Sequence, residues 1–474
     1  MTTSIVEETL AAAGYAKVIV SLKRGVAAAT ANRRTIESSI ADHFIIPSEQ
    51  QQESLAASAR RFASRSFTRS TPATKRRVRV YPNLGLAIGY IDRQGLAGLE
   101  ADAKVEKVVD APQLSLIRPV ATRTAKLATK ASWGLRRLNA ELMWDAGFKG
   151  KNVVVGHLDT GVDAKHPALN GAISAFAEFD LAGDQVPNAT PSDSDIHGTH
   201  TAGTIVGRSG AKGAFGMAPE AKLASAMVIE GGQVIDRILG GMDWIIGQNV
   251  RIMSMSLGLR GFTPAFQTIV DALRAANVLP VIAIGNEGPL SSRSPGNYHN
   301  VLSVGAMNAN NEVADFSGSQ RFDRPVDPLG PDLVAPGVAV LSCVPGGLHE
   351  EMDGSSMATP HVAGLAALLL QAKPDATAEE LEKAILGSCE RPASMEEARA
   401  NRGVPDAARA FTALTGNALP GASVAAATTF RGTRSRPTRL ERMPLTSRAT
   451  GAKKAKTKRK SAEKRKTRAK ERLT

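Results

Sequence analysis

The chain has 474 residues, of which 43% are apolar and 22% are charged, so it can bury a sizeable core and divide into two or three domains. This composition excludes a wholly disordered protein and a collagen-like one. The two cysteines, Cys343 and Cys389, are too few for a disulfide framework or a cysteine-rich zinc site, although a single disulfide bond between them is an alternative that the sequence allows.

The net charge of +14 is concentrated near the C-terminus. Residues 431–474 hold 18 Lys or Arg against 3 Asp or Glu, a net +15, so the residues before them are nearly neutral overall. We expect residues 416–474 to form a disordered, low-complexity basic tail, because its like charges repel and it has little to bury. The basic part, 431–474, could bind an anionic partner such as nucleic acid or a membrane surface nonspecifically, or be a solvated extension with no partner.

The sequence contains no transmembrane segment, because no apolar run approaches the roughly 18 residues needed to cross a bilayer. The first fifteen residues include Glu7 and Glu8 and lack a basic stretch followed by an apolar one, so a Sec signal is not indicated. We therefore favour a cytoplasmic location over an extracellular one reached by a non-Sec route. We also expect the protein to be a monomer.

Short segments rich in β-branched residues predict strands at 16–23, 78–81, 86–91 and 105–109. The spacing of Leu96, Leu99 and Ala103 predicts a helix over 93–103. These elements indicate a small α+β domain, which we assign to residues 1–125. Within it, residues 50–77 are polar and basic and are expected to form an exposed helix or loop, whereas the composition of 117–130 predicts a linker.

A second domain is expected at residues 126–415. Apolar runs at 153–155, 252–255, 278–284 and 301–304 are typical of strands buried on both faces, and helical segments lie between them. This alternation predicts an α/β fold, a parallel β-sheet with helices on both faces.

Two polar residues of this domain are candidates for proton transfer. Asp159 ends a predicted buried strand, where α/β proteins place ligand-facing groups, although a capping role in the turn is the ordinary alternative. His197 could act as a base if a carboxylate held its second ring nitrogen. His200 lies one helical turn later, but the spacing does not fit a zinc-binding helix, so we interpret it as structural.

A serine and an amide complete the set of candidates. Ser355 and Ser356 open an apolar helix after Gly354, which permits a tight turn into it, and a serine in that position is ordinarily a cap. Asn286 follows the predicted strand at 278–284 and offers a side-chain amide that could stabilise an oxyanion.

These residues lie in six motifs that occur in a characteristic order: VVVGHLDTGVD, HGTHTAG, MSMSLG, AIGNEG, PDLVAPG and GSSMATPHVAG. Together the motifs resemble the subtilisin-like serine proteases, the subtilase or peptidase S8 family, over residues 133–414. The resemblance implies a subtilisin-like fold and a serine endopeptidase that hydrolyses protein or peptide substrates through an acyl-enzyme. It implies that Ser356 is the nucleophile, His197 the general base and acid, Asp159 its orienting partner, and Asn286 an oxyanion donor.

The resemblance also implies a substrate-binding surface. Ser256, Leu257 and Gly258 would pair with the substrate as an added strand, and with Ala283, Ile284 and Gly285 they would wall the pocket for P1, the residue before the cleaved bond. Arg293 would lie near the pocket floor, where the family often has a small residue. There it could pair with an acidic P1 side chain, shorten the pocket against large aromatic residues, or point into solvent.

The N-terminal domain resembles, more loosely, the ferredoxin-like propeptide of this family. This implies a self-processing zymogen whose prodomain remains bound as an intramolecular inhibitor, with a junction between residues 115 and 131; a permanent accessory domain is the alternative. A second alternative for the whole chain is a catalytically silent scaffold tethered to anionic polymers by its tail, and the intact set of Asp159, His197, Ser356 and Asn286 favours the enzyme.

The metal chemistry of the family is expected to differ in this chain. His166-Pro-Ala168 and residues 208–212 lack the carboxylate and the Asn-rich loop of secreted relatives and carry positive charge instead. We therefore expect that no cofactor is required and that the family's strong calcium site is absent, while weaker calcium sites stay open.

Overall fold

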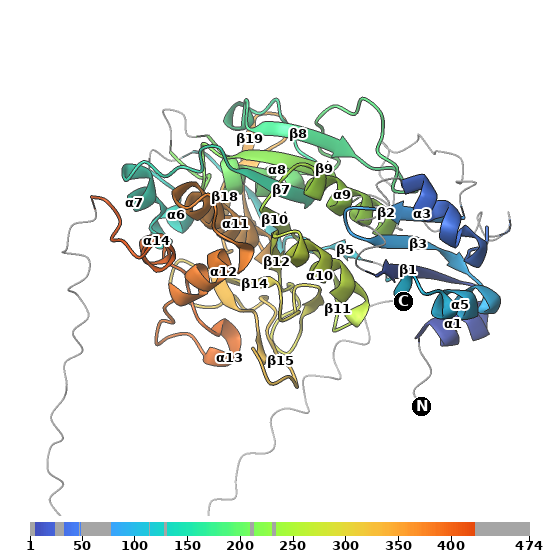
Figure 1. Ribbon diagram of the computed structural model, residues 1–474. Coiled ribbons are helices and arrows are strands. Elements are labelled where there is room, and N and C mark those ends of the chain that lie inside the picture. The colour runs from blue at the N-terminus through green and yellow to red at the C-terminus, as the bar shows by residue number, and fades with distance from the viewer. Residues whose placement is uncertain are drawn as a thin grey trace, which may run out of the picture. The chain divides into compact units, whose positions relative to one another are not determined.

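The computed structural model of the protein describes residues 5–23, 33–46, 48, 77–112, 114–127, 130–208, 213–229 and 234–421 (Figure 1). The predicted exposed segment at 50–77, except for Arg77, lies outside these residues. The predicted basic tail also lies outside them from residue 422 onward.

The N-terminal part forms a four-stranded antiparallel sheet with the strand order β2-β3-β1-β4. The strands and α5 lie where the sequence predicts them, and their chain order is that of a ferredoxin-like unit. The elements are α1 (Ile5–Ala13), β1 (Ala16–Leu22), α3 (Arg33–Ile40), η1 (Ala41–His43), β2 (Val78–Tyr81), β3 (Leu86–Ile91), α5 (Arg93–Ala101) and β4 (Val105–Asp110).

Strand β1 carries apolar side chains on both of its faces because both faces are covered. Val18 and Val20 pack in a cluster that includes residues of α1, α3 and α5. Ile19, which points to the opposite face, belongs to a core that includes residues of the larger domain. The N-terminal sheet is therefore packed between its own helices and the rest of the protein.

Seven parallel strands form the main sheet, which confirms the predicted α/β fold (Figure 1). In spatial order they are β17 (Leu333–Pro336), β14 (Leu302–Met307), β12 (Leu279–Ala283), β10 (Ile252–Met255), β7 (Val154–Asp159), β9 (Lys222–Met227) and β8 (Ile173–Glu178). All neighbouring pairs are parallel. Because parallel strands end at the same edge, the residues that follow β7, β10 and β12 come together there.

Helices cover both faces of the main sheet and create two cores. One core contains residues of α8 (His197–Val206), α11 (Ser355–Ala372), α12 (Ala378–Gly387) and α14 (Ala407–Thr415). The other contains residues of α9 (Ile235–Gly247) and α10 (Gln267–Ala275). Burial on both faces explains why these strands read in the sequence as continuous apolar runs.

Shorter elements surround the sheet: β5 (Ser115–Leu116), β6 (Ala121–Thr124), α6 (Trp133–Arg137), α7 (Ala140–Asp145), η2 (Pro167–Leu169), β11 (Leu257–Arg260), η3 (Pro264–Phe266), β13 (Arg293–Ser294), β15 (Gln320–Arg321), β16 (Leu329–Gly330), β18 (Val340–Val344), β19 (Leu348–Asp353) and α13 (Glu397–Ala400). None of the helices in the described ranges is long and apolar enough to span a membrane. Cys343 and Cys389 are both free thiols, so the disulfide bond that the sequence allowed is not formed.

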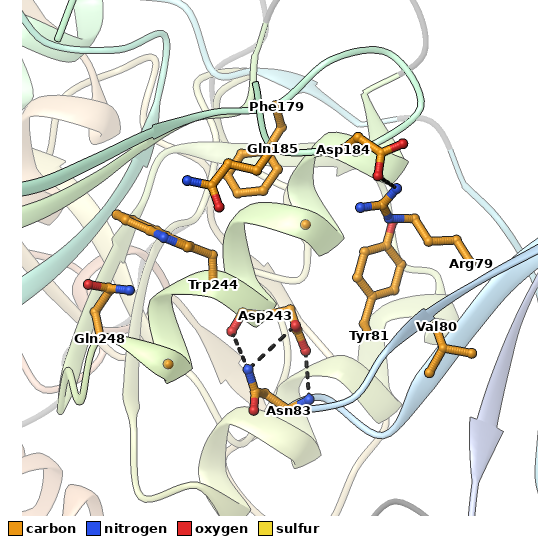
Figure 2. Close-up of a pocket in the computed structure, with 12 residues that line it drawn as sticks. Arg79, Val80, Tyr81, Asn83, Phe179, Asp184, Gln185, Asp243, Trp244 and Gln248 are labelled. Carbon is orange, nitrogen blue, oxygen red and sulfur yellow. Dashed lines mark hydrogen bonds and ion pairs between the residues drawn. The ribbon is translucent and has the colours of Figure 1, made fainter. Parts of the chain in front are cut away.

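Helix α9 is the main point of contact between the N-terminal sheet and the larger domain. In the crevice of Figure 2, about 420 Å³ in volume, the backbone N–H of Asn83 donates to Asp243 Oδ1 at 2.7 Å. Arg79 forms an ion pair with Asp184 at 2.5 Å in the same view. A further ion pair joins Lys17 to Asp236 in the first turn of α9, with side-chain exposures of only 15% and 10%.

The prediction of a linker at 117–130 is wrong for most of that segment. Strand β5 pairs with β11, and β6 pairs with β19, so residues on both sides of Ile117 are held by main-chain hydrogen bonds. Arg123 also forms a bidentate pair with Asp353, at 2.9 and 2.7 Å. The segment is an ordered crossing between the two units, because neighbouring strands supply partners that its own sequence does not reveal.

Candidate active site

The main sheet brings four candidate side chains to its carboxyl edge. Asp159 is the last residue of β7, and His197 is the first residue of α8. Ser356 is the second residue of α11, and Asn286 lies three residues beyond β12. The four therefore come from separate segments of the chain that share one edge of the sheet.

Asp159 and His197 form a buried hydrogen-bonded pair. His197 Nδ1 lies 2.7 Å from Asp159 Oδ1, and each residue is 1% exposed. Burial opposes the charged imidazolium, but the carboxylate outweighs it and raises the pKa of His197 above its ordinary value. Burial likewise opposes the carboxylate, but the imidazole and a hydrogen bond from the Thr160 N–H lower the pKa of Asp159. The pair is thus arranged to hold a positive charge on His197.

Further hydrogen bonds, which sequence reasoning missed, support this pair. The Thr201 hydroxyl donates to Asp159 Oδ2 at 3.1 Å and also lies 2.9 Å from His157 Nε2. Burial lowers the pKa of His157 to about 4, so this ring is neutral beneath the carboxylate. Thr201 belongs to HGTHTAG and His157 to VVVGHLDTGVD, so the motifs contained the signal, but their place beneath the carboxylate depends on the fold.

Asp193 forms a second buried acidic position near the pair. Its carboxylate accepts hydrogen bonds from the hydroxyls of Thr160, at 2.7 Å, and Thr199, at 2.5 Å. Burial raises the pKa of Asp193 to about 6 despite these bonds. The Thr160 hydroxyl also accepts a bond from the Gly198 N–H, so this network fixes the start of α8 beside β7.

Asn286 is oriented by the residue before Ser356. The backbone N–H and the hydroxyl of Ser355 both donate to Asn286 Oδ1 at 2.8 Å, which leaves Nδ2 free to face the cleft. There Nδ2 donates to the Arg118 carbonyl at 2.9 Å. Gly354 has an extended backbone, with φ of 170°, so its role is space: a Cβ there would lie 3.2 Å from Asn286 Nδ2.

Residues 115–118 occupy the cleft in front of Ser356. Leu116 pairs with Leu257 and Ser115 with Gly258 in an antiparallel register, and the Ile117 N–H donates to the Ser256 carbonyl at 3.0 Å. The Ser356 hydroxyl donates to the Ile117 carbonyl. Within the described part of the chain, His197 Nε2 has no hydrogen-bond partner, so the serine hydroxyl faces Ile117 and not the imidazole.

The predicted pocket walls are both buried and lie on either side of Arg293. Ala283, Ile284 and Gly285 are buried, and the Arg293 N–H donates to the Ile284 carbonyl at 2.8 Å. Gly285 has a left-handed φ of 119°, and a Cβ there would come within 3.1 Å of Arg293 Cγ. The alternative that Arg293 points into solvent is wrong, because the residue is only 7% exposed.

Arg293 already has an anionic partner, which the sequence did not indicate. Its Nε lies 3.0 and 3.1 Å from the two carboxylate oxygens of Glu287, and its Nη2 contacts the same group. Burial opposes ionisation of Glu287, but the guanidinium outweighs it and lowers the pKa of this carboxyl. Arg293 is therefore already paired before any acidic P1 side chain arrives.

The remaining candidates do not form a metal site in the described residues. His200 Nε2 bonds the backbone carbonyls of Val340 and Glu350 at 2.9 and 3.2 Å, as a structural residue would. In the described ranges no group of three or more His, Cys, Asp or Glu could hold a metal ion. Residues 209–212, part of the segment expected to lack the calcium loop of secreted relatives, lie outside those ranges, and Arg208 donates to the Gly171 carbonyl at 2.9 Å.

The chemistry available here is acyl transfer to a hydroxyl. A buried imidazole with a raised pKa can accept a proton, and the adjacent carboxylate stabilises the resulting charge. The amide of Asn286 donates to the Arg118 carbonyl. Ser356, in the first turn of α11, donates to the Ile117 carbonyl. The paired strand shows how a peptide can be positioned by its backbone.

Comparisons with known proteins agree with this chemistry. Residues 150–413 match the family model described as the Subtilase family. Subtilisin E of Bacillus subtilis (strain 168) is 36% identical over 257 residues, covering 52% of this chain and 63% of that protein. Subtilisin of Bacillus pumilus is also 36% identical over 257 residues, covering 52% of this chain and 87% of that protein. The intracellular serine protease of Paenibacillus polymyxa is 39% identical over 245 residues, covering 50% of this chain and 72% of that protein.

The Asp159 carboxylate should control the titration of His197. In a Ser356→Ala background, we expect His197 to titrate above its ordinary pKa of 6.5, and Asp159→Asn to lower that pKa, because burial then acts without the compensating charge. NMR titration of ¹⁵N-labelled histidine rings measures both values. His361, which is buried at a pKa of about 4 and bonded to the Met357 carbonyl, is the internal control and should not move. An unchanged His197 pKa in Asp159→Asn would contradict the assignment.

Proposed function

The chain belongs to the subtilase family, and on that premise we propose that it is a serine endopeptidase made as a self-processing zymogen. One observation carries the proposal: a backbone carbonyl, that of Ile117, is held against the Ser356 hydroxyl beside the Asp159–His197 pair. The chain spans less than two thirds of the length of subtilisin E, so the activity of the whole protein is inferred from this site.

The proposed mechanism assigns a separate role to each group. Ser356 Oγ attacks the carbonyl carbon of the substrate while His197 Nε2 takes its proton, and Asp159 stabilises the imidazolium. Asn286 Nδ2 and the Ser356 N–H stabilise the oxyanion, and loss of one such donor costs about 10²–10³ in kcat in a well-studied member of this family. His197 then protonates the leaving amine, and water hydrolyses the acyl-enzyme by the reverse sequence of proton transfers.

The first substrate of this site is the chain itself, and the bond is Ile117–Arg118. The Ile117 N–H bonds Ser256 and its carbonyl meets Ser356, as expected for the residue before the cleaved bond. Asn286 contacts the Arg118 carbonyl instead, which points to Arg118–Pro119 as the competing bond. That bond is the poorer candidate, because proline restricts the conformation of the residue before it and its ring nitrogen would have to be the leaving group.

After cleavage, the N-terminal unit would remain bound and inhibit the site. Residues 115–117 would keep their strand pairing with β11, and the contacts of Lys17 and Asn83 with α9 would hold the rest of the unit in place. Dissociation of the unit, not cleavage, would then control the appearance of activity.

Processing should depend on Ser356. Wild-type protein incubated alone should yield a fragment beginning at Arg118 and should then degrade casein, whereas Ser356→Ala should do neither. Intact-mass spectrometry identifies the junction to the residue, so a fragment beginning at Pro119 would contradict the assigned bond. A wild-type chain that stays full length and leaves casein intact, and that a fluorophosphonate probe does not label at Ser356, would contradict the proposed activity.

Removing the buried ion pair should release the inhibitor sooner. Lys17→Met leaves Asp236 without this partner in a site where both side chains are mostly buried, which typically costs a few kcal/mol. We expect the cleaved unit to bind at least roughly tenfold more weakly, so that the lag before casein hydrolysis shortens while the rate of processing does not change. Arg409→Met, which removes a surface pair with Glu390, is the matched control and should leave the lag unchanged. An unaltered lag in Lys17→Met would argue against inhibition through α9.

We further propose that the protein does not depend on calcium. Near the region where relatives carry a strong site, Arg208 donates to the Gly171 carbonyl, and the Ala168 N–H donates to His166 Nδ1. A strong site saturated about 1,000-fold above its Kd would add about 4 kcal/mol of stability. Excess EGTA should therefore leave the Tm of Ser356→Ala unchanged, whereas a fall of several degrees that added calcium reverses would overturn this proposal.

A further inference from the structure

Arg293 spans the space between the two backbone walls of the proposed pocket. Its aliphatic stem lies beside both walls, since a Cβ on Gly258 would come within 2.8 Å of Arg293 Cβ and one on Gly285 within 3.1 Å of Arg293 Cγ. Its Nη1 donates to the Gly258 carbonyl at 3.1 Å. A side chain that enters between these walls therefore meets Arg293 before it can extend further.

The same guanidinium contacts the chain segment in the cleft. Arg293 Nη1 donates to the Ser115 hydroxyl at 2.9 Å. Ser115 and Ile117 are two residues apart in an extended, paired segment, so their side chains project from the same face of that segment. Ile117 is fully buried there, whereas Ser115 lies at the exposed rim.

Glu287 fixes this arrangement. Its carboxylate accepts hydrogen bonds from Arg293 Nε and Nη2. The remaining nitrogen, Nη1, donates to Ser115 and Gly258. Arg260, with a side chain 74% exposed, contacts the same carboxylate from the solvent side at 3.2 Å. The guanidinium is thus held in a fixed position by its partners and not as a mobile charge.

We propose that the Arg293–Glu287 pair determines substrate specificity. It selects a short aliphatic side chain at P1, as in Ile117, and a hydroxyl side chain two residues earlier, as in Ser115. Large aromatic P1 residues are excluded by the aliphatic stem of Arg293, and acidic ones gain nothing because all three guanidinium nitrogens already have partners. The inference rests on the proposed protease function and names the substrates of that site.

The junction of the chain itself provides the test substrate, so the full-length protein can be used. Variants at Ser115 and Ile117 are made in cell-free translation, and the rate at which the fragment 118–474 appears is followed by pulse-chase. In otherwise wild-type protein, Ile117→Val should be processed at the normal rate, while Ile117→Phe and Ile117→Glu should each slow processing at least tenfold. Ser115→Ala should slow it about fivefold, the range expected for one lost hydrogen bond.

Second-site variants separate this specificity from general damage. Arg293→Gly should restore processing of Ile117→Phe by opening the pocket. Arg293→Met keeps the stem but lacks the donor, so it should still reject Ile117→Phe while Ser115→Ala has no additional effect in its presence. Arg409→Met is the control for loss of an arginine from a carboxylate pair and should change no preference. Because Arg293→Gly empties a buried position, circular dichroism checks its fold, and Arg293→Met provides an independent measurement.

The outcomes distinguish the inference from the function on which it rests. Rescue of Ile117→Phe by Arg293→Gly, together with loss of the Ser115 effect in Arg293→Met, would establish it. Normal processing of Ile117→Phe in the wild-type background, or a Ser115 effect that persists in Arg293→Met, would overturn the inference while leaving the protease function intact. A wild-type chain that is never processed, and that no fluorophosphonate labels at Ser356, would overturn the proposed function and this inference with it.

Discussion

Asp159 carries its carboxylate at a point that almost no water reaches, and the residues around it are arranged to offset the lost solvation. The Thr160 N–H, the Thr201 hydroxyl and His197 Nδ1 all bond its two oxygens. Only the last of these partners can gain a positive charge. The need to satisfy one buried carboxylate therefore also fixes the tautomer and the direction of the imidazole, so that its second nitrogen faces the cleft.

This constraint also explains why the site lies at this edge of the sheet. Asp159 ends the interior strand β7, and the other parallel strands of the sheet deliver their following residues to the same edge. Ser355, the residue before Ser356, orients the amide of Asn286: its N–H and its hydroxyl donate to Asn286 Oδ1 and thereby turn Nδ2 toward the cleft. Two polar networks, one around Asp159 and one around Asn286, thus orient the imidazole of His197 and the amide of Asn286 at this edge.

The elements that the sequence predicts well are those that carry a long, simple signal. Strands β7, β10, β12 and β14 are buried on both faces and read as apolar runs. The candidate residues lie in motifs that end β7 and β12, for Asp159 and Asn286, or that open α8 and α11, for His197 and Ser356. Strands β5 and β6 are too short to have a pattern of their own and exist only because β11 and β19, more than 130 residues away, supply partners. Glu287 was missed for a similar reason: it lies in the motif AIGNEG, but its pairing with Arg293 depends on how two loops fold together.

In the proposed processing, cleavage of the tether would change what must hold the N-terminal unit in place. While residues 114–118 are continuous, the segment is delivered to the cleft at a high effective concentration and needs little affinity of its own. Once the bond is cut, the inhibitor stays only through noncovalent contacts, and these are spread over two distant regions. The strand pairing with β11 is backbone-mediated and could be offered by any extended peptide, so it cannot distinguish the inhibitor from a substrate. The contacts on α9 can make that distinction. They consist of an apolar sheet face, the Asn83–Asp243 bonds and the Lys17–Asp236 pair, and a short peptide has none of these. Under the proposed function, retention of the inhibitor would therefore depend on α9, whereas recognition of substrates would depend on the cleft and on Arg293, so mutations could alter one property without altering the other.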